Sequence, residues 1–166
     1  MLNKLKCILY ASDFGSDSRK GFRMAVTLAR TNQARLIFMH VIEPLGQREE
    51  RLINSYMTEA QFKAQESEGI EIIREEITVR IQKFSAEELP VDDEFSHAQP
   101  ECRIEQGRPA EQIIRVAKEI DADLIVIGTR THSTLSQILV GSTAHQMLFC
   151  SDRPVLVVPM EGDHNC

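Results

Sequence analysis

The stretch that decides the fold is Leu124-Ile-Val-Ile-Gly-Thr-Arg-Thr-His132, followed after residues 133–140 by Gly141-Ser-Thr-Ala-His-Gln-Met-Leu-Phe149. The apolar run at 124–127, bounded by a turn signal, predicts a buried parallel strand, and residues 144–149 predict a helix. A loop rich in glycine, serine and threonine therefore joins a strand to a helix. Such a loop favours phosphate binding, because N–H groups at a helix start lack partners and the helix dipole attracts anions. Glycines there let the backbone approach phosphate oxygens closely.

A purely structural interpretation of these residues is also open. Gly128 is then a turn glycine, and Ser142 is an ordinary N-cap, since serine is favoured at that position. Asp13, at the end of the first expected strand, has a similar alternative as a cap of a helix that begins near Ser16 or Asp17. The sequence alone does not separate a cap from a ligand-binding residue.

The composition indicates one globular domain. The chain has 166 residues, of which 42% are hydrophobic and 27% charged, enough for a substantial core. The net charge of −6 argues against nucleic acid or an anionic membrane as the main partner, because both are bound through basic faces. No apolar stretch is as long as a membrane span, and the first residues lack the pattern of a signal peptide. We therefore expect a cytoplasmic protein.

The cysteines and histidines do not indicate a metal or redox site. Cys7, Cys102, Cys150 and Cys166 are dispersed, and none belongs to a Cys-x-x-Cys pair. Cys7 and Cys102 lie in strand-like runs and are expected to be core thiols. No group of His, Asp and Glu has the spacing of a metal site. His40 is expected to be a packed or edge residue.

Apolar runs and helical patterns alternate along the chain. Strands are expected at 6–11, 35–42, 101–105, 124–127 and 154–159, and helices at 17–29, from 107–109 to about 120, and at 144–149. This alternation predicts an α/β fold with an open parallel sheet and helices on both faces. Residues 47–88 are charged and helical in pattern, which fits two helical segments or one long helix disturbed near Gly69. Residues 90–100 are expected to form a surface loop.

The last expected strand has the features of a sheet edge. Pro154 and Pro159 flank Val155 to Val158, and proline is confined to edge strands. The strand at 101–105 is short and alternating, so it too is expected near an edge. An exposed apolar edge needs a cover, and pairing with the same strand of a second copy would give a homodimer. The alternative is that the acidic tail folds back over this edge.

Taken in order, several fragments resemble the universal stress protein family over nearly the whole chain. They are Ala11-Ser-Asp-Phe14, His40-Val41, Gly107-Arg-Pro-Ala110, Ala122 to Arg130 and Asp152 to Pro159. The resemblance implies one domain at residues 1–160, with a long, charged helical connection at about 46–100 and a short acidic tail at 161–166. It also implies a Rossmann-like sheet of five strands in the order 3-2-1-4-5, of the adenine nucleotide alpha hydrolase type.

Nucleotide-binding members of that family carry glycine, two residues, glycine, nine residues, and then Gly-Ser or Gly-Thr. Gly128, the spacing and Gly141-Ser142 match this motif, but Thr131 stands at the middle glycine. A β-branched residue there opposes close approach of a phosphate. The Thr131 hydroxyl could instead donate a hydrogen bond to the phosphate. Thr131 could therefore either weaken or strengthen nucleotide binding.

The resemblance implies a binding site for ATP or AMP, with Mg²⁺ accompanying a triphosphate. The implied residues are Ala11, Ser12, Asp13, Val41, Ile127, Gly128, Arg130, Thr131, His132, Gly141, Ser142 and Thr143. Asp13 would accept hydrogen bonds from ribose hydroxyls, Val41 would present its backbone to the adenine, and residues 141–143 would hold phosphate. The first and fourth strands would flank the switch point of this sheet order, where ligands of open parallel sheets bind.

These inferences favour a small dimeric ATP-binding regulator or sensor of the stress response, without catalytic residues. One alternative is a nucleotide-free dimeric interaction module, for which Thr131 is the main evidence. The other is a slow ATPase, for which Arg130 and His132 are the candidate groups near the terminal phosphate. The simpler interpretation of His132 is a loop histidine that faces solvent, because the sequence places no nucleophile or second titrating group beside it.

Overall fold

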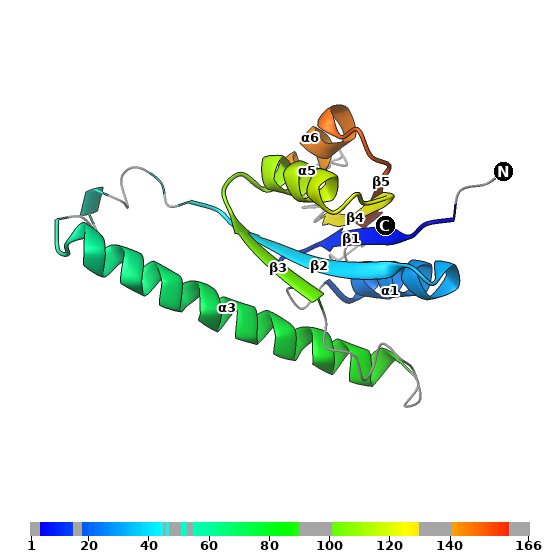
Figure 1. Ribbon diagram of the computed structural model, residues 1–166, viewed down its shortest axis with the longest axis horizontal. Coiled ribbons are helices and arrows are strands. Elements are labelled where there is room, and N and C mark those ends of the chain that lie inside the picture. The colour runs from blue at the N-terminus through cyan, green and yellow to red at the C-terminus, as the bar shows by residue number, and fades with distance from the viewer. Residues whose placement is uncertain are drawn as a thin grey trace, which may run out of the picture.

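A parallel five-stranded sheet lies between two layers of helices (Figure 1). The computed structural model describes residues 4–14, 18–44, 46, 51–52, 55–89, 101–129 and 141–159. The strands are β1 (Cys7–Ala11), β2 (Arg35–Ile42), β3 (Glu101–Gln106), β4 (Leu124–Thr129) and β5 (Val155–Pro159). The helices are α1 (Arg19–Asn32), α3 (Glu59–Glu88), α5 (Pro109–Glu119) and α6 (Ser142–Cys150). Residues 90–100 and 161–166, expected to form a loop and a tail, lie outside the described residues.

The sheet has the order β3-β2-β1-β4-β5 with every neighbouring pair parallel, which confirms the expected topology. Both β3 and β5 lie at edges, as their sequences predict. Strand β4 is longer than expected and ends at Thr129. Gly128 therefore lies within β4, opposite Val158 of β5, and the interpretation as a turn glycine is wrong.

Two hydrophobic cores fill the spaces between the sheet and its helices. On one face, α1 and α3 pack over an aromatic cluster that includes Tyr10, Phe22 and Phe38. On the other face, α5 and α6 pack over the alternate side chains of the same strands. The alternation along β1 is direct, because Tyr10 faces the first core and Leu9 the second. A strand buried on both faces explains the continuous apolar runs in the sequence.

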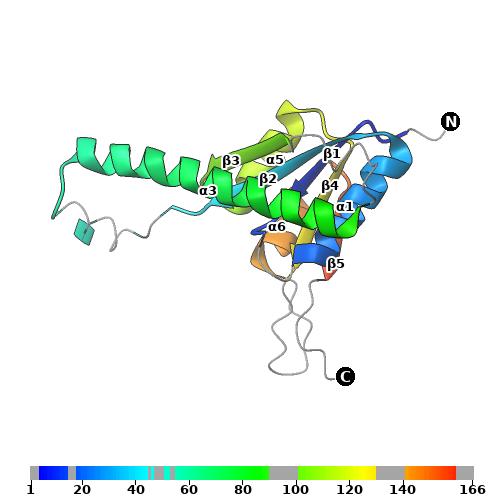
Figure 2. The same cartoon turned by 90° about the horizontal axis from the view of Figure 1, so that it is seen from below.

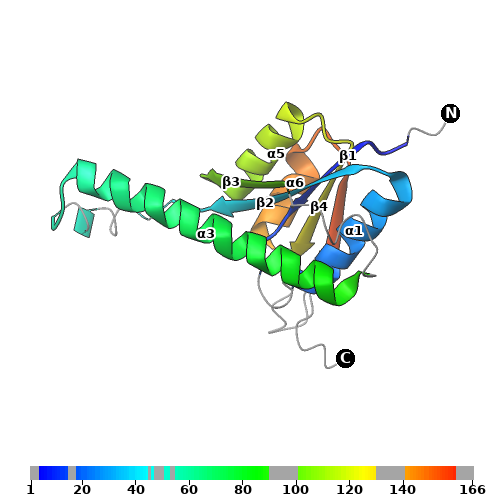
Figure 3. The ribbon, with the colours of Figure 1, turned by 60° about the horizontal axis from the view of Figure 1, so that its bottom comes forward.

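Helix α3 is one continuous helix of 30 residues, so the expected disturbance near Gly69 is wrong. It begins with a capping box in which Thr58 and Gln61 satisfy each other's backbone N–H groups. Only its second half is buried, through residues that include Ile77, Ile81 and Phe84. The first half projects past β3 (Figures 2 and 3). Gly69 lies in open surroundings, so its cost of about 1 kcal/mol in helix propensity is offset by packing further along.

The amino ends of β1 and β4 are joined by Asp123. Its carboxylate accepts hydrogen bonds from the backbone N–H groups of Lys6, at 2.6 Å, and Cys7, at 2.9 Å. These two bonds favour the ionised carboxylate and lower the pKa of Asp123 below its ordinary value. The two central strands are thereby held in register at their amino ends.

The two cysteines that were expected to be core thiols lie in strands, and one of them is buried. Cys7 is buried and Cys102 half-buried, and burial raises the pKa of both thiols. Cys150 is exposed at the end of α6. Among the described helices, none combines the length and apolar character needed to cross a bilayer.

Candidate functional site

A cavity of about 570 Å³ opens at the carboxyl ends of β1 and β4, the switch point of the sheet. Its walls include every predicted site residue that the structure describes, namely Ala11, Ser12, Asp13, Val41, Ile127, Gly128, Gly141, Ser142 and Thr143. These residues come from β1, β2, β4 and α6, far apart in the sequence. The predicted residues Arg130, Thr131 and His132 lie outside the described part of the chain.

The turn after β1 presents Asp13 to the cavity. Three hydrogen bonds made by Ser12 hold this turn in place. The Ser12 N–H donates to the carbonyl of Met39 at 3.0 Å, and its hydroxyl accepts from the N–H of Phe14 at 3.0 Å. The ring Nδ1 of His40 donates to the Ser12 carbonyl, also at 3.0 Å. Asp13 itself is exposed at the rim of the cavity.

The helix that follows this turn begins later than expected. Its first residue is Arg19, and its N-cap residue is Ser18, which is fully buried. Asp13 is therefore not the N-cap residue of α1, and its carboxylate is placed at the cavity wall.

The start of α6 forms the opposite end of the cavity. Its N-cap residue is Gly141 and not Ser142, and no side chain caps this helix, so the interpretation of Ser142 as a cap is wrong. Ser142 is instead the first helical residue and is exposed. As in any α-helix, the N–H groups of Ser142 and Thr143 have no acceptor within the helix. Together with the helix dipole they make this end suited to an anion.

Thr129 fixes the position of that helix start. Its Oγ1 accepts a hydrogen bond from the N–H of Gly141 at 3.1 Å, which joins the end of β4 to the N-cap of α6 across residues 130–140. Thr129 is only 7% exposed. The Gly141 N–H is thus engaged by the protein itself, and the N–H groups available to a ligand begin at Ser142.

Apolar side chains form the wall between these two polar ends. Met39 and Val41 contribute from β2, Ile127 from β4, and Pro109 and Ile113 from the first turns of α5. An apolar wall with backbone groups at strand ends suits a flat heterocycle, which hydrogen-bonds through its edge and packs through its faces. The site is therefore apolar in the middle, with a carboxylate at one end and helix N–H groups at the other.

Charge in the described part of the cavity is negative. The carboxylates of Asp13 and Glu43 line it, whereas no lysine or arginine among the described residues does. The same residues contain no group of three or more His, Cys, Asp or Glu side chains able to hold a metal ion. An anion bound here would consequently depend on backbone N–H groups and hydroxyls.

Several wall residues were not predicted from the sequence, namely Met39, His40, Glu43, Pro109, Ile113, Thr129 and Ala144. A signal existed for Thr129, which directly follows the predicted glycine. A signal also existed for Pro109, which opens the helix after β3, because the amino ends of such helices lie near the carboxyl ends of the strands. His40 and Glu43 could be found only once the end of β2 was placed beside β1.

Comparison with known proteins identifies the family to which this fold belongs. The Universal stress protein family matches residues 4–159. Universal stress protein YxiE of Bacillus subtilis is 32% identical over 160 residues, which cover 95% of this chain and 99% of the relative. The solved structure of MJ0577 from Methanocaldococcus jannaschii is 24% identical and has a TM-score of 0.66 over 96% of this chain and 99% of its own. A universal stress protein solved in complex with cAMP is 21% identical, with a TM-score of 0.61 over 95% of this chain and 98% of its own.

The two solved structures share the fold, and the family match extends over β1 to β5 and over all the described walls of the cavity. The chain therefore belongs to the universal stress protein family.

Proposed function

We propose that this protein binds an adenine nucleotide in the cavity at the ends of β1 and β4 and acts as a nucleotide-dependent regulator. The observation that carries the proposal is the cavity itself, whose apolar wall separates the Asp13 carboxylate from the start of α6. A nucleoside monophosphate has the same order of groups, with a flat base, hydroxyls and an anion. The structural neighbour that binds cAMP supports an adenine nucleotide as the ligand class.

In this arrangement the adenine lies against Val41 and Ile127, and the ribose hydroxyls donate to Asp13. The phosphate accepts from the N–H groups of Ser142 and Thr143 and from the Ser142 hydroxyl. A regulator needs only that the nucleotide bind two conformations of the protein unequally. ATP and AMP share all of these contacts, so both are expected to bind.

The carboxylates in the cavity make Mg²⁺ important for ATP. With Asp13 and Glu43 in the wall, a free triphosphate meets like charge, which opposes binding. The described residues offer no cage for the ion, so Mg²⁺ would be held by the phosphates, with its charge reducing this repulsion. We expect EDTA to weaken ATP binding and to leave adenosine binding unchanged.

Calorimetric titration with adenosine, AMP and Mg-ATP tests the proposal, with Gly141→Val as the discriminating variant. Among the described residues, a Cβ at Gly141 meets only the Thr129 hydroxyl, at 3.6 Å, and the Gly141 φ of −53° suits any residue, so the described fold should tolerate a side chain. The valine would instead crowd the phosphate end of the cavity. We expect AMP and Mg-ATP binding to be lost in this variant and adenosine to be weakened less.

Gly69→Val is the matched control, because a Cβ there meets no described atom within 4 Å and Gly69 does not line the cavity. Unfolding transitions of both variants show whether the fold is kept. Absence of binding of all three ligands to the wild type would refute the proposal, and equal losses in both variants would place the ligand elsewhere.

We also propose that β5 pairs with the β5 of a second copy. In the structure β5 pairs on one side only, with β4, and no other strand among the described residues pairs with its other side. The bond from the Ile125 N–H to the Pro154 carbonyl fixes the ladder, so that the N–H groups of Val155 and Val157 point outward. Leu148 and Phe149 of α6 are 54% and 77% exposed, and they add apolar surface to the chain that a partner could cover.

Val157→Pro is the direct test of this pairing. Proline removes the outward N–H of Val157 and keeps the bonds from β5 to β4, which involve the alternate residues. Light scattering should give a dimer for the wild type and for Val157→Thr, and a monomer for Val157→Pro. A monomeric wild type at micromolar concentration would refute the dimer, and so would a dimeric proline variant.

A further inference from the structure

The turn that carries Asp13 is held in an unusual backbone conformation. Phe14 has a φ of 51°, in the left-handed region that non-glycine residues rarely occupy. Its ring is fully buried, packed edge-on against Tyr10 with ring centres 5.7 Å apart and tilted against Phe38 at 6.2 Å. The buried ring therefore fixes one side of the turn, while Asp13 stands on the other side, at the cavity.

A second contact holds this turn from a distant part of the chain. The guanidinium of Arg80, on α3, donates to the carbonyl of Phe14 through Nη1. Arg80 follows the buried Ile77 and precedes the buried Ile81, both of which pack into the same core as the Phe14 ring. His40 thus anchors the peptide group between Ser12 and Asp13, and Arg80 anchors the peptide group that follows Phe14.

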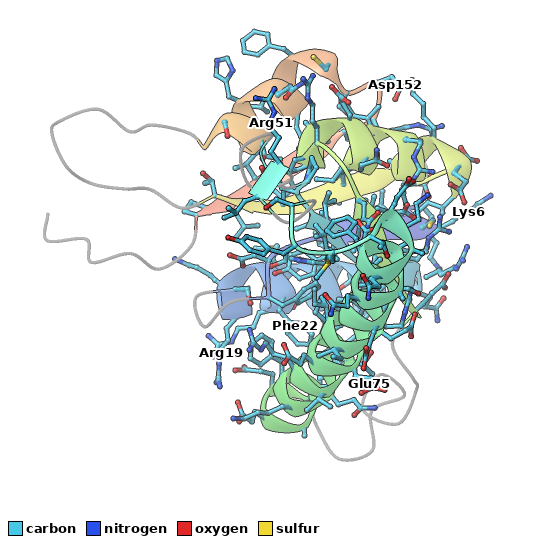
Figure 4. The ribbon with its side chains drawn as sticks, turned by 90° about the vertical axis from the view of Figure 1, so that its left-hand side faces the viewer. Lys6, Arg19, Phe22, Arg51, Glu75 and Asp152 are labelled. Atoms are coloured by element: carbon cyan, nitrogen blue, oxygen red, sulfur yellow. The ribbon has the colours of Figure 1, made fainter. Side chains whose placement is uncertain are left out.

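The part of α3 that carries Arg80 is fixed to α1. Arg19 forms an ion pair with Glu87 at 2.6 Å and lies over the ring of Phe84, with its guanidinium carbon 5.2 Å from the ring centre. Arg23 pairs with Glu88 at 2.7 Å. Figure 4 shows Arg19 and Phe22 of α1 beside this half of α3, and Phe22 packs edge-on against Phe84. These contacts dock the half of α3 that carries Arg80 against α1.

We propose that Arg80 is a positioning residue for nucleotide binding, which acts through Asp13 and couples the occupancy of the cavity to helix α3. This inference rests on the proposed function, because Asp13 is the ribose-binding group in that proposal. Arg80 does not line the cavity, so it has no contact with the ligand in this account. Without its bond, the left-handed turn at Phe14 loses a support, and the Asp13 carboxylate is no longer held in one place.

The test is calorimetric titration of adenosine and AMP with Arg80→Met, which keeps an apolar stem and removes the donor. Arg74→Met is the matched control, since Arg74 lies on the same helix and bonds a β3 carbonyl, that of Cys102, at 3.4 Å. We expect Arg80→Met to weaken both ligands by about fivefold, because both carry the ribose. Arg80→Lys should recover part of the loss, and Arg74→Met should bind as the wild type does.

A double-mutant cycle with Asp13→Asn distinguishes positioning from general destabilisation. If Arg80 acts through Asp13, Arg80→Met has no further effect on affinity in the Asp13→Asn background. The same fivefold loss in both backgrounds would overturn the proposal, and so would a loss equal to that of Arg74→Met.

Amide hydrogen exchange makes the inference testable even if no nucleotide binds. In the ligand-free protein, the N–H groups of Asp13 and Phe14 should exchange about tenfold faster in Arg80→Met than in Arg74→Met. Failure of the wild type to bind any adenine nucleotide would refute the proposed function alone. Equal exchange rates in the two variants would refute the positioning role of Arg80.

Discussion

Replacing Thr129 with valine should lower the free energy of unfolding by about 1 kcal/mol, the net contribution of one hydrogen bond. The Oγ1–N distance of 3.1 Å to Gly141 lies in the normal range, and Thr129 is 7% exposed. Valine has the same shape as threonine, so the change removes the acceptor without opening a cavity. Gly141 is only half-buried, so water can partly replace the lost acceptor. The loss should therefore stay below the roughly 3 kcal/mol of a fully buried unpaired group.

Urea unfolding followed by circular dichroism measures this difference, with an unchanged slope against urea. The wild type and Thr129→Val form one pair of proteins that differ by the Oγ1 atom. Thr129→Ser and Thr129→Ala form a second pair, which also differs by the side-chain oxygen but lacks the threonine methyl group. Both pairs should show a loss of about 1 kcal/mol when the oxygen is removed. If the members of each pair agree within about 0.3 kcal/mol, Thr129 does not hold the start of α6, and our account of the phosphate end is wrong.

Three further changes test other parts of the structure. Asp13→Ala should weaken ATP and adenosine by similar factors, about fivefold in calorimetry, and a loss for ATP alone would remove Asp13 from the nucleoside end. Gly21→Ala should destabilise the fold by about 1–3 kcal/mol in thermal unfolding, since its Cβ would lie 2.8 Å from the buried Tyr10 hydroxyl; an unchanged transition would contradict this packing. Because the fold lowers the pKa of Asp123, the wild type should exceed Asp123→Asn in stability above about pH 4, and lose that advantage as pH falls through the lowered pKa. A difference in urea stability that is the same at neutral and strongly acidic pH would show that the Asp123 carboxylate does not act in this way.

The strands could be predicted from the sequence because their signals are local, whereas the sheet order and most of the cavity residues were implied by the family resemblance. The run at 35–42 is a strand with those bounds, and the glycines and serine of the motif lie at the cavity wall. The caps were predicted less well. Serine is favoured as an N-cap, yet Gly141 takes that position because Thr129 engages its N–H from the end of β4.

The contacts that the sequence does not reveal are those between distant segments. Arg80 looks like one of many charged residues on a long helix, and its bond to Phe14 depends on α3 crossing the face of the sheet. Gly69 illustrates the same limit. A glycine need not disturb a helix that is held by packing elsewhere, and the buried Ile77 and Ile81 hold α3 in this way.

The central claim is that an adenine nucleotide binds at the carboxyl ends of β1 and β4, and backbone amide NMR during titration with AMP tests it most directly. We predict that the largest chemical-shift changes fall at residues 11–13, 127–129 and 141–144. In the complex, the amide shift of Ser142 should also change with pH over the range in which the phosphate of AMP titrates. A second cavity, of about 420 Å³, lies at the amino ends of the same strands and is lined by Lys4, Lys6 and Asp121 among others. Shift changes centred on that cavity, or none at millimolar AMP, would contradict the claim.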